Sequence, residues 1–324
     1  MSTENSLSNH AGPSNADRPP LALIAGPTAG GKSDLAVRLA LALQGQGRRA
    51  VVINADSAQV YADLAIVSAR PSADEMQGIE HRLFGTWDGA IACSAADWAA
   101  AATREVAACH AEGALPILVG GTGLYIRTLI DGIAPMPPID PDVRTQVRAL
   151  PLPEAFAVLQ TEDPARAAVL SPNDSARITR ALEVVRSTGR GMAEWHGERH
   201  GGIGHAVTLH PAILLPDRAW LYPRCDLRFV RMLERGAIEE VRALLGRKLD
   251  AALPVMRAIG VPELSDFVLG RANLAEAALR GAQATRNYAK RQYTWFRRQL
   301  PLDWPRIASE TYDVNAIFEL LLRT

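Results

Sequence analysis

The stretch LALIAGPTAGGKSDLAVRLALALQ, residues 21–44, decides the fold. It starts as a short apolar run that ends in glycine, passes through GPTAGGKS at residues 26–33, and continues with helical periodicity. The middle part fits the pattern G-x-x-x-x-G-K-(S/T), and the order strand, glycine loop, helix is the context in which this pattern binds phosphate. The stretch therefore predicts a phosphate-binding loop, without indicating which phosphate compound the loop holds.

The motif supplies three kinds of phosphate contact. Successive backbone N–H groups and the N-terminus of the following helix form a cradle for anions. Lys32 adds a positive charge, and the hydroxyl of Ser33 is a usual ligand of Mg²⁺, which we expect as the cofactor. We assign the whole motif to phosphate binding, namely Gly26, Pro27, Thr28, Ala29, Gly30, Gly31, Lys32 and Ser33.

Strands and helices alternate after the loop. The segments 48–57 and 114–123, RRAVVINADS and ALPILVGGTG, read as strands, and the helix predicted between them has Ser94 as its N-cap and Gly113 as its stop. This alternation predicts an α/β fold like that of the P-loop NTPases, in which a parallel sheet carries helices on both faces. Ligands of such sheets bind at the carboxyl ends of the strands. We therefore expect one crevice to contain Lys32, Ser33, Asp56, Ser57 and Thr122.

The pattern changes near residue 134, where the proline-rich segment APMPPIDPD begins. From there to about residue 200 the chain reads as short helices without a strand signal, and strand character returns in HAVTLHPAILLP. The first residues are rich in Ser, Asn and Pro, which is typical of a flexible tail. We predict a tail at 1–19, a discontinuous catalytic core at 20–135 and 201–324, and a helical insertion domain at 136–200.

The composition limits the partners and the compartment. Hydrophobic residues make up 48% of the chain and charged residues 22%, as in soluble globular proteins. No apolar run is long enough to cross a bilayer, and the tail lacks the pattern of a signal peptide. Cys93, Cys109 and Cys225 are odd in number and widely spaced, so they indicate buried thiols in the cytoplasm rather than disulfides or a zinc site.

The formal net charge is zero, but positive charge is concentrated late in the chain. In the amphipathic segment 284–299 we assign Tyr288, Gln292, Trp295 and Phe296 to the packing side, with arginines and a lysine on another side. Arg177, Arg180 and Arg186 share a helix of the predicted insertion. Two basic helices beside one cleft indicate contact with a phosphodiester backbone.

Asp56 is the first candidate for chemistry outside the loop. P-loop ATPases usually end a second apolar strand in an aspartate that holds magnesium, whereas the strand PILV ends here in Gly-Gly-Thr. Asp56 instead ends the strand that follows the loop helix. The residue types leave three roles open for it: metal ligand, general base, or N-cap of a following helix.

Six stretches together resemble the bacterial tRNA dimethylallyltransferases, also called tRNA isopentenyltransferases: GPTAGGKS, NADSAQVY, CSAADW, LVGGTGLYI, SPNDSARITRALEV and TRNYAKRQYTW. The combination of Asp-Ser-x-Gln-x-Tyr with Gly-Gly-Thr-Gly-Leu-Tyr is more specific than the loop alone. The resemblance implies transfer of a dimethylallyl group from dimethylallyl diphosphate to N6 of adenosine 37 in tRNA, with release of pyrophosphate. The loop would then hold the diphosphate of a prenyl donor rather than a nucleoside triphosphate.

The resemblance also implies roles for individual residues. Asp56 would be the general base, Lys32 and Arg228 would stabilise pyrophosphate together with Mg²⁺ near Ser33, and Thr122 would hydrogen-bond near the target adenine, which must be flipped out of its stack. The implied partner is the anticodon stem-loop of tRNA. We expect the protein to act as a monomer and not to bind a membrane. Implied tRNA contacts are Asp56, Ser57, Ala58, Gln59, Thr122, Arg144, Ala176, Arg177, Ile178, Thr179, Arg180, Arg257, Ala258, Ile259 and Gly260.

The chain departs from the family pattern at three places. Ile259-Gly260 is followed by Val261-Pro262 where the family commonly has a tyrosine and a basic residue, so the expected contacts stop at Gly260. Phe84-Gly85 follows HRL in place of an acidic residue, and Ser68-Ala69-Arg70-Pro71 replaces Thr-Ala-Lys-Pro with its positive charge kept.

Two other enzyme classes fit parts of the pattern. An adenylate isopentenyltransferase would share the loop and the aspartate but would not need the helical insertion or the basic helix. A P-loop small-molecule kinase would need ATP specificity and a lid with phosphate-binding arginines, which the arginines at 177–190 could supply.

Overall fold

The computed structural model describes residues 18–135, 138–197 and 199–323, so the predicted tail lies outside the described residues except for its last two. The chain forms two compact units, one made of the residues up to 127 and from 204 onward, the other of residues 128–203. The division lies several residues outside the joints expected from the sequence. The reason is that the two segments that connect the units are hydrogen-bonded to each other. Ile203 N–H donates to Leu129 O (2.8 Å), and Ile133 and His200 form an antiparallel bridge.

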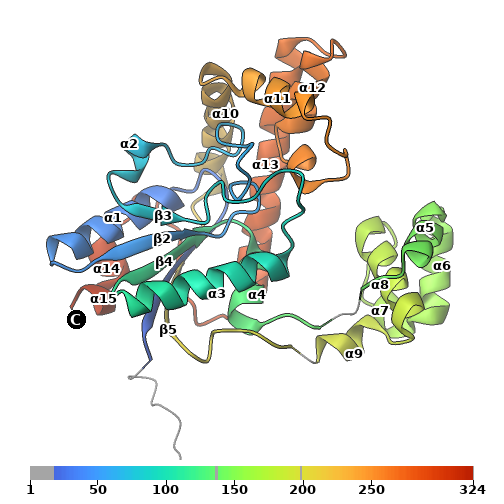
Figure 1. Ribbon diagram of the computed structural model, residues 1–324, viewed down its shortest axis with the longest axis horizontal. Helices are drawn as coiled ribbons and strands as arrows, with labels where there is room; N and C mark the ends of the chain where they lie inside the picture. The colour runs from blue at the N-terminus through green and yellow to red at the C-terminus, as the bar shows by residue number, and fades with distance from the viewer. Residues whose placement is uncertain (1–17, 136–137, 198, 324) are drawn as a thin grey trace, which may run out of the picture. The chain divides into compact units, whose positions relative to one another are not determined.

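The larger unit contains a six-stranded sheet (Figure 1). Every pair of neighbouring strands is parallel, which confirms the predicted α/β fold. The strands lie in the order β3 (Glu80–Arg82), β2 (Ala50–Asn54), β4 (Leu115–Gly120), β1 (Pro20–Ala25), β5 (Thr208–Leu214) and β6 (Arg306–Ile307). β3 and β6 were not expected from the sequence, because strands of three and two residues are too short to show a period.

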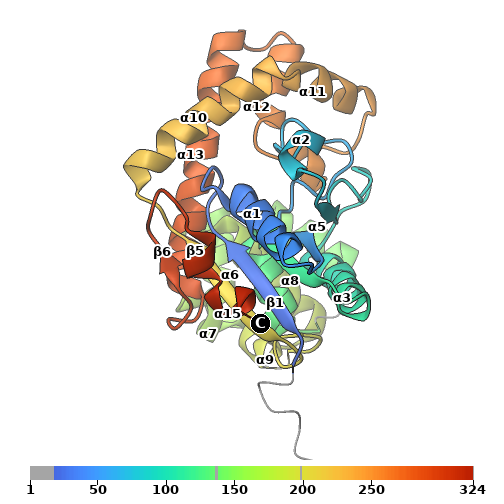
Figure 2. The same cartoon turned by 90° about the vertical axis from the view of Figure 1, so that its left-hand side faces the viewer.

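Helices cover both faces of this sheet. On one face α1 (Lys32–Gly45) buries Leu35, Leu39 and Leu43 against the strands, beside α14 (Val314–Ile317) and α15 (Glu319–Leu322). On the other face lie α3 (Ala95–Ala111) and α4 (Gly123–Asp131) (Figures 1 and 2). Both predicted ends of α3 are confirmed. Ser94 forms a capping box with Asp97, and Gly113 follows the last turn with a φ of 68°.

A second group of helices stands beyond the carboxyl ends of the strands (Figure 1). The long helices α10 (Arg218–Glu234) and α13 (Leu274–Gln299) pack against each other. The contact is so close that a Cβ added at Gly281 of α13 would lie 2.0 Å from the ring of Phe229 of α10. The group also contains α2 (Ala73–Met76), α11 (Ala237–Gly246), the 3₁₀ helix η2 (Pro254–Arg257) and α12 (Val261–Val268). These helices therefore surround the edge of the sheet at which parallel α/β proteins bind ligands.

Apart from the isolated bridge between Ile133 and His200, the regular secondary structure in the described residues of the smaller unit is helical. Its helices are α5 (Pro141–Ala149), α6 (Leu152–Glu162), α7 (Pro164–Ala167), α8 (Ser175–Thr188) and α9 (Met192–His196). They enclose an apolar core of their own, in which Val147, Leu159, Ile178 and Leu182 are almost fully buried. A separate core is what defines a domain, so these helices form a small helical domain.

The described part of the chain contains no helix that is both long and apolar enough to cross a bilayer. The three cysteines are buried and free, as the sequence indicates.

Candidate active site

The phosphate loop connects β1 to α1 in a conformation that requires glycine. Gly31 caps α1 with a φ of 83°, and a Cβ at Gly26 would lie 2.4 Å from the carbonyl oxygen of Leu214. Two distant side chains hold the loop from outside: the Tyr312 hydroxyl donates to Gly30 O (2.8 Å) and Arg224 Nε donates to Ala29 O (3.0 Å). The loop is therefore fixed before any ligand binds.

Lys32 is partly buried at the start of α1, and its Nζ donates to Pro27 O (2.7 Å). Burial lowers the pKa of Lys32 to about 8, the negative charge of Asp56 acts in the opposite direction, and the positive charge of Arg228 lowers the pKa further. Lys32, Asp56 and Arg228 thus lie within electrostatic reach of one another, as the sequence analysis expected for the chemical centre.

Asp56 is positioned by the buried side chain of Asn54. Asn54 Oδ1 accepts a hydrogen bond from Asp56 N–H (2.9 Å), and Asn54 Nδ2 donates to Asp56 O (3.1 Å). Asp56 Oδ1 accepts from Ala58 N–H (2.9 Å), which closes a turn. The helix-cap alternative for Asp56 is wrong, because the next helix begins only at Ala73. The second carboxylate oxygen makes no hydrogen bond within the described chain.

Thr122 joins the turn that follows β4 to the turn that follows β2. Its Oγ1 accepts a hydrogen bond from Ser57 N–H (2.9 Å) and donates to Ser57 Oγ (3.1 Å), and its own N–H donates to Ala55 O (3.1 Å). Ser57 lines the cavity described in the next paragraph, whereas Thr122 is not among the residues that line this cavity. Thr122 therefore holds the segment that carries Asp56.

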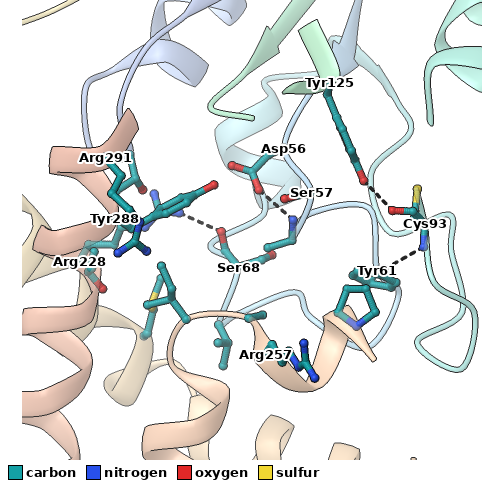
Figure 3. A pocket seen from close by; sticks show the side chains of 18 residues that line it. Asp56, Ser57, Tyr61, Ser68, Cys93, Tyr125, Arg228, Arg257, Tyr288 and Arg291 are labelled. Carbon is teal, nitrogen blue, oxygen red and sulfur yellow. Dashed lines mark hydrogen bonds between the residues drawn. The ribbon is translucent and has the colours of Figure 1, made fainter. Parts of the chain in front are cut away.

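We call the first of two cavities the aspartate cavity, which Figure 3 shows from close by. The polar side chains that line it are Asp56, Ser57, Ser68 and Tyr288. The positive charges come from Arg228, Arg257 and Arg291. The apolar lining includes Val67, Met232 and Ile259. A carboxylate, several cations and an apolar wall thus face one space of the size class that holds small ligands.

Aromatic side chains close one end of the aspartate cavity. The Tyr125 hydroxyl donates to Cys93 O (3.1 Å), and the Tyr61 hydroxyl accepts from Cys93 N–H (3.1 Å). Trp98 stacks on Tyr125 with ring centroids 4.6 Å apart. Burial raises the pKa of the Cys93 thiol, which disfavours the reactive thiolate form.

The second space, which we call the arginine cavity, adjoins the loop at Ala29 and Ser33. It is lined by Arg70, Arg224, Arg228, Arg231 and Arg235, with Asp34, Asp74 and Glu75 as the acidic members. Arg70 has room because position 85 is glycine: a Cβ there would lie 1.7 Å from the Arg70 guanidinium. Arg228 and Met232 line both cavities, so the two spaces meet at one cation and one thioether.

Helix α13 contributes residues that sequence reasoning assigned elsewhere. Tyr288, assigned to packing, lines the aspartate cavity together with Thr285 and Arg291, each three residues apart on one face of α13. Burial and the charge of Asp56 raise the pKa of Tyr288, so its hydroxyl stays protonated. The spacing signal was present in the sequence, but a packing face and a cavity face have the same helical period.

The expected tRNA contacts separate into several groups. Asp56, Ser57, Ala58, Arg257, Ala258 and Ile259 line the aspartate cavity. Gln59 does not: its buried Nε2 donates to Ser68 O (3.1 Å) and Ala69 O (3.0 Å), so its side chain supports the fold. Gly260 is buried with a φ of 97°, and Val261 is fully buried at the start of α12, which explains how an apolar residue is accommodated there.

In the smaller unit, the predicted contact residues lie on α5 and α8. Ala176, Arg177 and Arg144 are exposed, and Thr179 and Arg180 are partly exposed. Ile178 is corrected to a core residue, because its side chain is fully buried among the other apolar residues of this unit.

The side chains near the loop offer few ligands for a metal ion. Within the described residues no group of three or more His, Cys, Asp or Glu side chains could hold a metal ion. The Ser33 hydroxyl at the edge of the arginine cavity is nevertheless compatible with Mg²⁺, since this ion usually takes only one or two protein ligands and completes its shell with phosphate oxygens and water.

The fold and the site define a P-loop-like α/β protein in which a cavity with a carboxylate and a cavity with a cluster of arginines adjoin the phosphate loop. Residues 59–299 match the sequence model of a family described as IPP transferase. The chain belongs to this family of tRNA dimethylallyltransferases, which confirms the resemblance inferred from the sequence.

Two relatives illustrate the likeness. The tRNA dimethylallyltransferase of Erythrobacter litoralis (strain HTCC2594) is 61% identical over 307 residues, which cover 95% of this chain and 97% of the relative. That of Novosphingobium aromaticivorans is 63% identical over 278 residues, or 86% of this chain and 99% of the relative.

Solved structures agree with the sequence relatives. The full-length tRNA isopentenylpyrophosphate transferase from Bacillus halodurans superposes with a TM-score of 0.64 at 33% identity, covering 93% of this chain and 94% of its own. A eukaryotic dimethylallyltransferase described as acting on tRNA gives a TM-score of 0.71 at 27% identity, covering 86% of this chain and 69% of its own.

Proposed function

We propose that this protein transfers the dimethylallyl group of dimethylallyl diphosphate to N6 of adenosine 37 in tRNA and releases pyrophosphate. The observation that carries the proposal is that Asp56 and Arg228 line one cavity beside the phosphate loop and influence each other electrostatically. The reaction needs a base for the adenine amine and a cation for the leaving group, and these side chains are the two types required.

The donor diphosphate is proposed to bind in the arginine cavity. Three arginines of α10 and the arginine that caps its C-terminus line this cavity: Arg224, Arg228, Arg231 and Arg235. Their intervals of four, three and four residues place the side chains on one face. The loop adjoins this cavity at Ala29 and Ser33, and its N–H groups and the charge of the neighbouring Lys32 add to the positive potential there. Mg²⁺ held at the Ser33 hydroxyl would supply further positive charge to the diphosphate oxygens.

The acceptor adenine is proposed to enter the aspartate cavity as a flipped base, because N6 of a stacked base is out of reach. N6 attacks C1 of the dimethylallyl group while the bond between C1 and the bridging oxygen breaks, and the electron pair leaves with pyrophosphate. The N6 proton passes to the free carboxylate oxygen of Asp56. Arg228, at the boundary of the two cavities, stabilises the charge that grows on the bridging oxygen.

The smaller unit is proposed to bind the backbone of the anticodon stem-loop through its exposed arginines, which carry no base code but raise affinity. One chain lines both cavities, so we propose that the enzyme acts as a monomer. The free cysteines and the tRNA substrate support a cytoplasmic location.

One assay separates the proposed function from its alternatives. Radiolabelled dimethylallyl diphosphate is offered with tRNA, with AMP, and alone. Label transferred to tRNA, with loss of transfer when adenosine 37 is replaced, is the expected result. Transfer to AMP instead would identify an adenylate isopentenyltransferase. Absence of transfer in all three reactions would overturn the proposal. The hypothesis to test next would then be a P-loop small-molecule kinase.

A further inference from the structure

One buried amide connects the two loops that carry the proposed chemistry. Gln292 of α13 is 5% exposed. Its Oε1 accepts a hydrogen bond from Thr28 N–H of the phosphate loop (2.8 Å), and its Nε2 donates to Gly121 O at the end of β4 (2.8 Å). A Cβ at Gly121 would lie 2.2 Å from Nε2, so glycine at position 121 is a condition for this bridge.

The bridge links the donor loop to the acceptor carboxylate. Gly121 is followed by Thr122, which is hydrogen-bonded to Ser57, the neighbour of Asp56. The parallel pairing of β1 with β4 and of β4 with β2 places both loops at one edge of the sheet, and the Gln292 amide adds a direct side-chain link between them.

The bridge also restricts which N–H groups can hold phosphate. Thr28 N–H is already bound to Gln292, and Thr28 lines the aspartate cavity. Ala29 and Ser33 line the arginine cavity instead. The diphosphate is thereby directed to the part of the loop near the start of α1, and the Thr28 end is left beside the acceptor base.

We propose that Gln292 is a positioning residue that sets the prenyl donor against the acceptor base; this inference rests on the proposed function. Attack of N6 on C1 requires the reacting atoms to be aligned within a fraction of an ångström, and a misplacement of about 1 Å costs roughly 100-fold in rate. Loss of the bridge slows the chemical step while tRNA still binds.

Two substitutions of similar size separate positioning from packing. Gln292→Met fills the space without either hydrogen bond. Gln292→Glu has, when protonated, one carbonyl acceptor and one O–H donor in the places of the amide groups. When ionised, it turns a negatively charged acceptor toward the Gly121 carbonyl and loses the donor. Tyr288 contacts Gln292, and its raised pKa keeps it neutral throughout the range tested. Lys32 of the adjoining loop has a pKa lowered to about 8 and loses its proton within this range, so each variant rate is compared with the wild-type rate at the same pH.

The experiment measures single-turnover rates at saturating tRNA and dimethylallyl diphosphate, from about pH 6 to about pH 8.5. Gln292→Met is expected to be roughly 10- to 100-fold slower than wild type at every pH. For Gln292→Glu, the ratio of its rate to the wild-type rate is expected to rise as the pH falls, because the protonated carboxyl restores the bridge. Gln283→Met is the matched control, since Gln283 is exposed on the same helix and bonds to Asn287.

Filter binding of tRNA and thermal unfolding complete the test. Unchanged tRNA affinity together with the pH-dependent ratio supports the proposal. A Gln292→Met rate close to wild type, or a Gln292→Glu ratio that is the same at every pH, overturns it and leaves Gln292 as a packing residue. If wild-type protein does not prenylate tRNA at all, the proposed function has failed, which is a different outcome from a wild-type enzyme that tolerates these substitutions.

Discussion

The two oxygens of the Asp56 carboxylate have separate tasks. Oδ1 closes a turn through Ala58 N–H, and the other oxygen is available to a ligand in the aspartate cavity. An asparagine at this position keeps an oxygen for the turn but cannot take up a proton. The substitution Asp56→Asn therefore tests the chemistry of the side chain without removing its structural contact.

We expect Asp56→Asn to lower the single-turnover rate at saturating tRNA by about 10²- to 10⁴-fold, the usual contribution of a general base. Binding of tRNA should change little, because the turn is preserved. Rapid-quench measurement of prenylated tRNA checks the rate. A rate within a few-fold of wild type would return Asp56 to the role of turn stabiliser.

The charge of Lys32 depends on pH near neutrality, because burial lowers its pKa to about 8. Below this pH the ammonium is charged and attracts the diphosphate; as the pH rises through about 8 the proton is lost. We expect the affinity for an unreactive donor analogue to be highest below that pH and to fall above it. Lys32→Ala should bind the analogue weakly and lack this step, with tRNA affinity nearly intact. Equal loss of tRNA binding would show that the role of the loop is misassigned.

At the scale of the element, α10 presents its arginines as a row. The intervals between Arg224 and Arg235 place these side chains on the face that lines the arginine cavity. Arg224 is bound to Ala29 O, Arg228 NH2 donates to Ser68 O (2.8 Å), and Arg235 lies 3.5 Å from Glu75. Arg231 is exposed on the same face, so its replacement gives the clearest test of whether this face binds the donor.

We expect Arg231→Gln to weaken binding of the donor analogue by about 10-fold, the value of one hydrogen bond to a charged group. Arg242→Gln on α11 is the control, because Arg242 is exposed and lines neither cavity. Calorimetric titration with the analogue measures both variants. Equal affinities for Arg231→Gln and wild type would remove this end of α10 from the donor site.

At the scale of the whole molecule, the smaller unit carries basic side chains on a core of its own. Glu183 is buried and lies near three arginines, 3.0 Å from Arg148, 3.6 Å from Arg180 and 3.9 Å from Arg144. Arg177 pairs with Asp174 at 2.9 Å. A buried carboxylate that restrains exposed guanidinium groups favours a preformed surface for phosphates.

Replacement of both Arg177 and Arg180 by alanine is expected to weaken tRNA binding and to reduce the log–log salt slope by roughly one unit per lost contact. Binding of the donor analogue should not change. Arg186→Ala, on the same helix, is the control, because Arg186 is held by both oxygens of Glu162. A wild-type salt slope in the double variant would assign these arginines to the fold of the insertion.

Local patterns were sufficient for much of the architecture. The phosphate loop, the main parallel strands, the caps of α3 and the helical insertion all follow from residues within one or two turns or strands of each other. Backbone propensity, capping and hydrophobic period act over such short distances, so the sequence alone determined these features. The family resemblance added an expected chemical role for single residues such as Asp56, through motifs that are equally short.

The arrangement of the site was decided only by the tertiary structure. Gln292 meets Thr28 and Gly121 across 264 and 171 residues, and neither contact leaves a local signal. The same helical period describes Tyr288, which faces a cavity, and Ile178, which faces a core. A periodic pattern shows that a face is covered, but what covers it depends on the packing of distant segments. That packing brings Arg228 and Met232 to the junction of the two cavities.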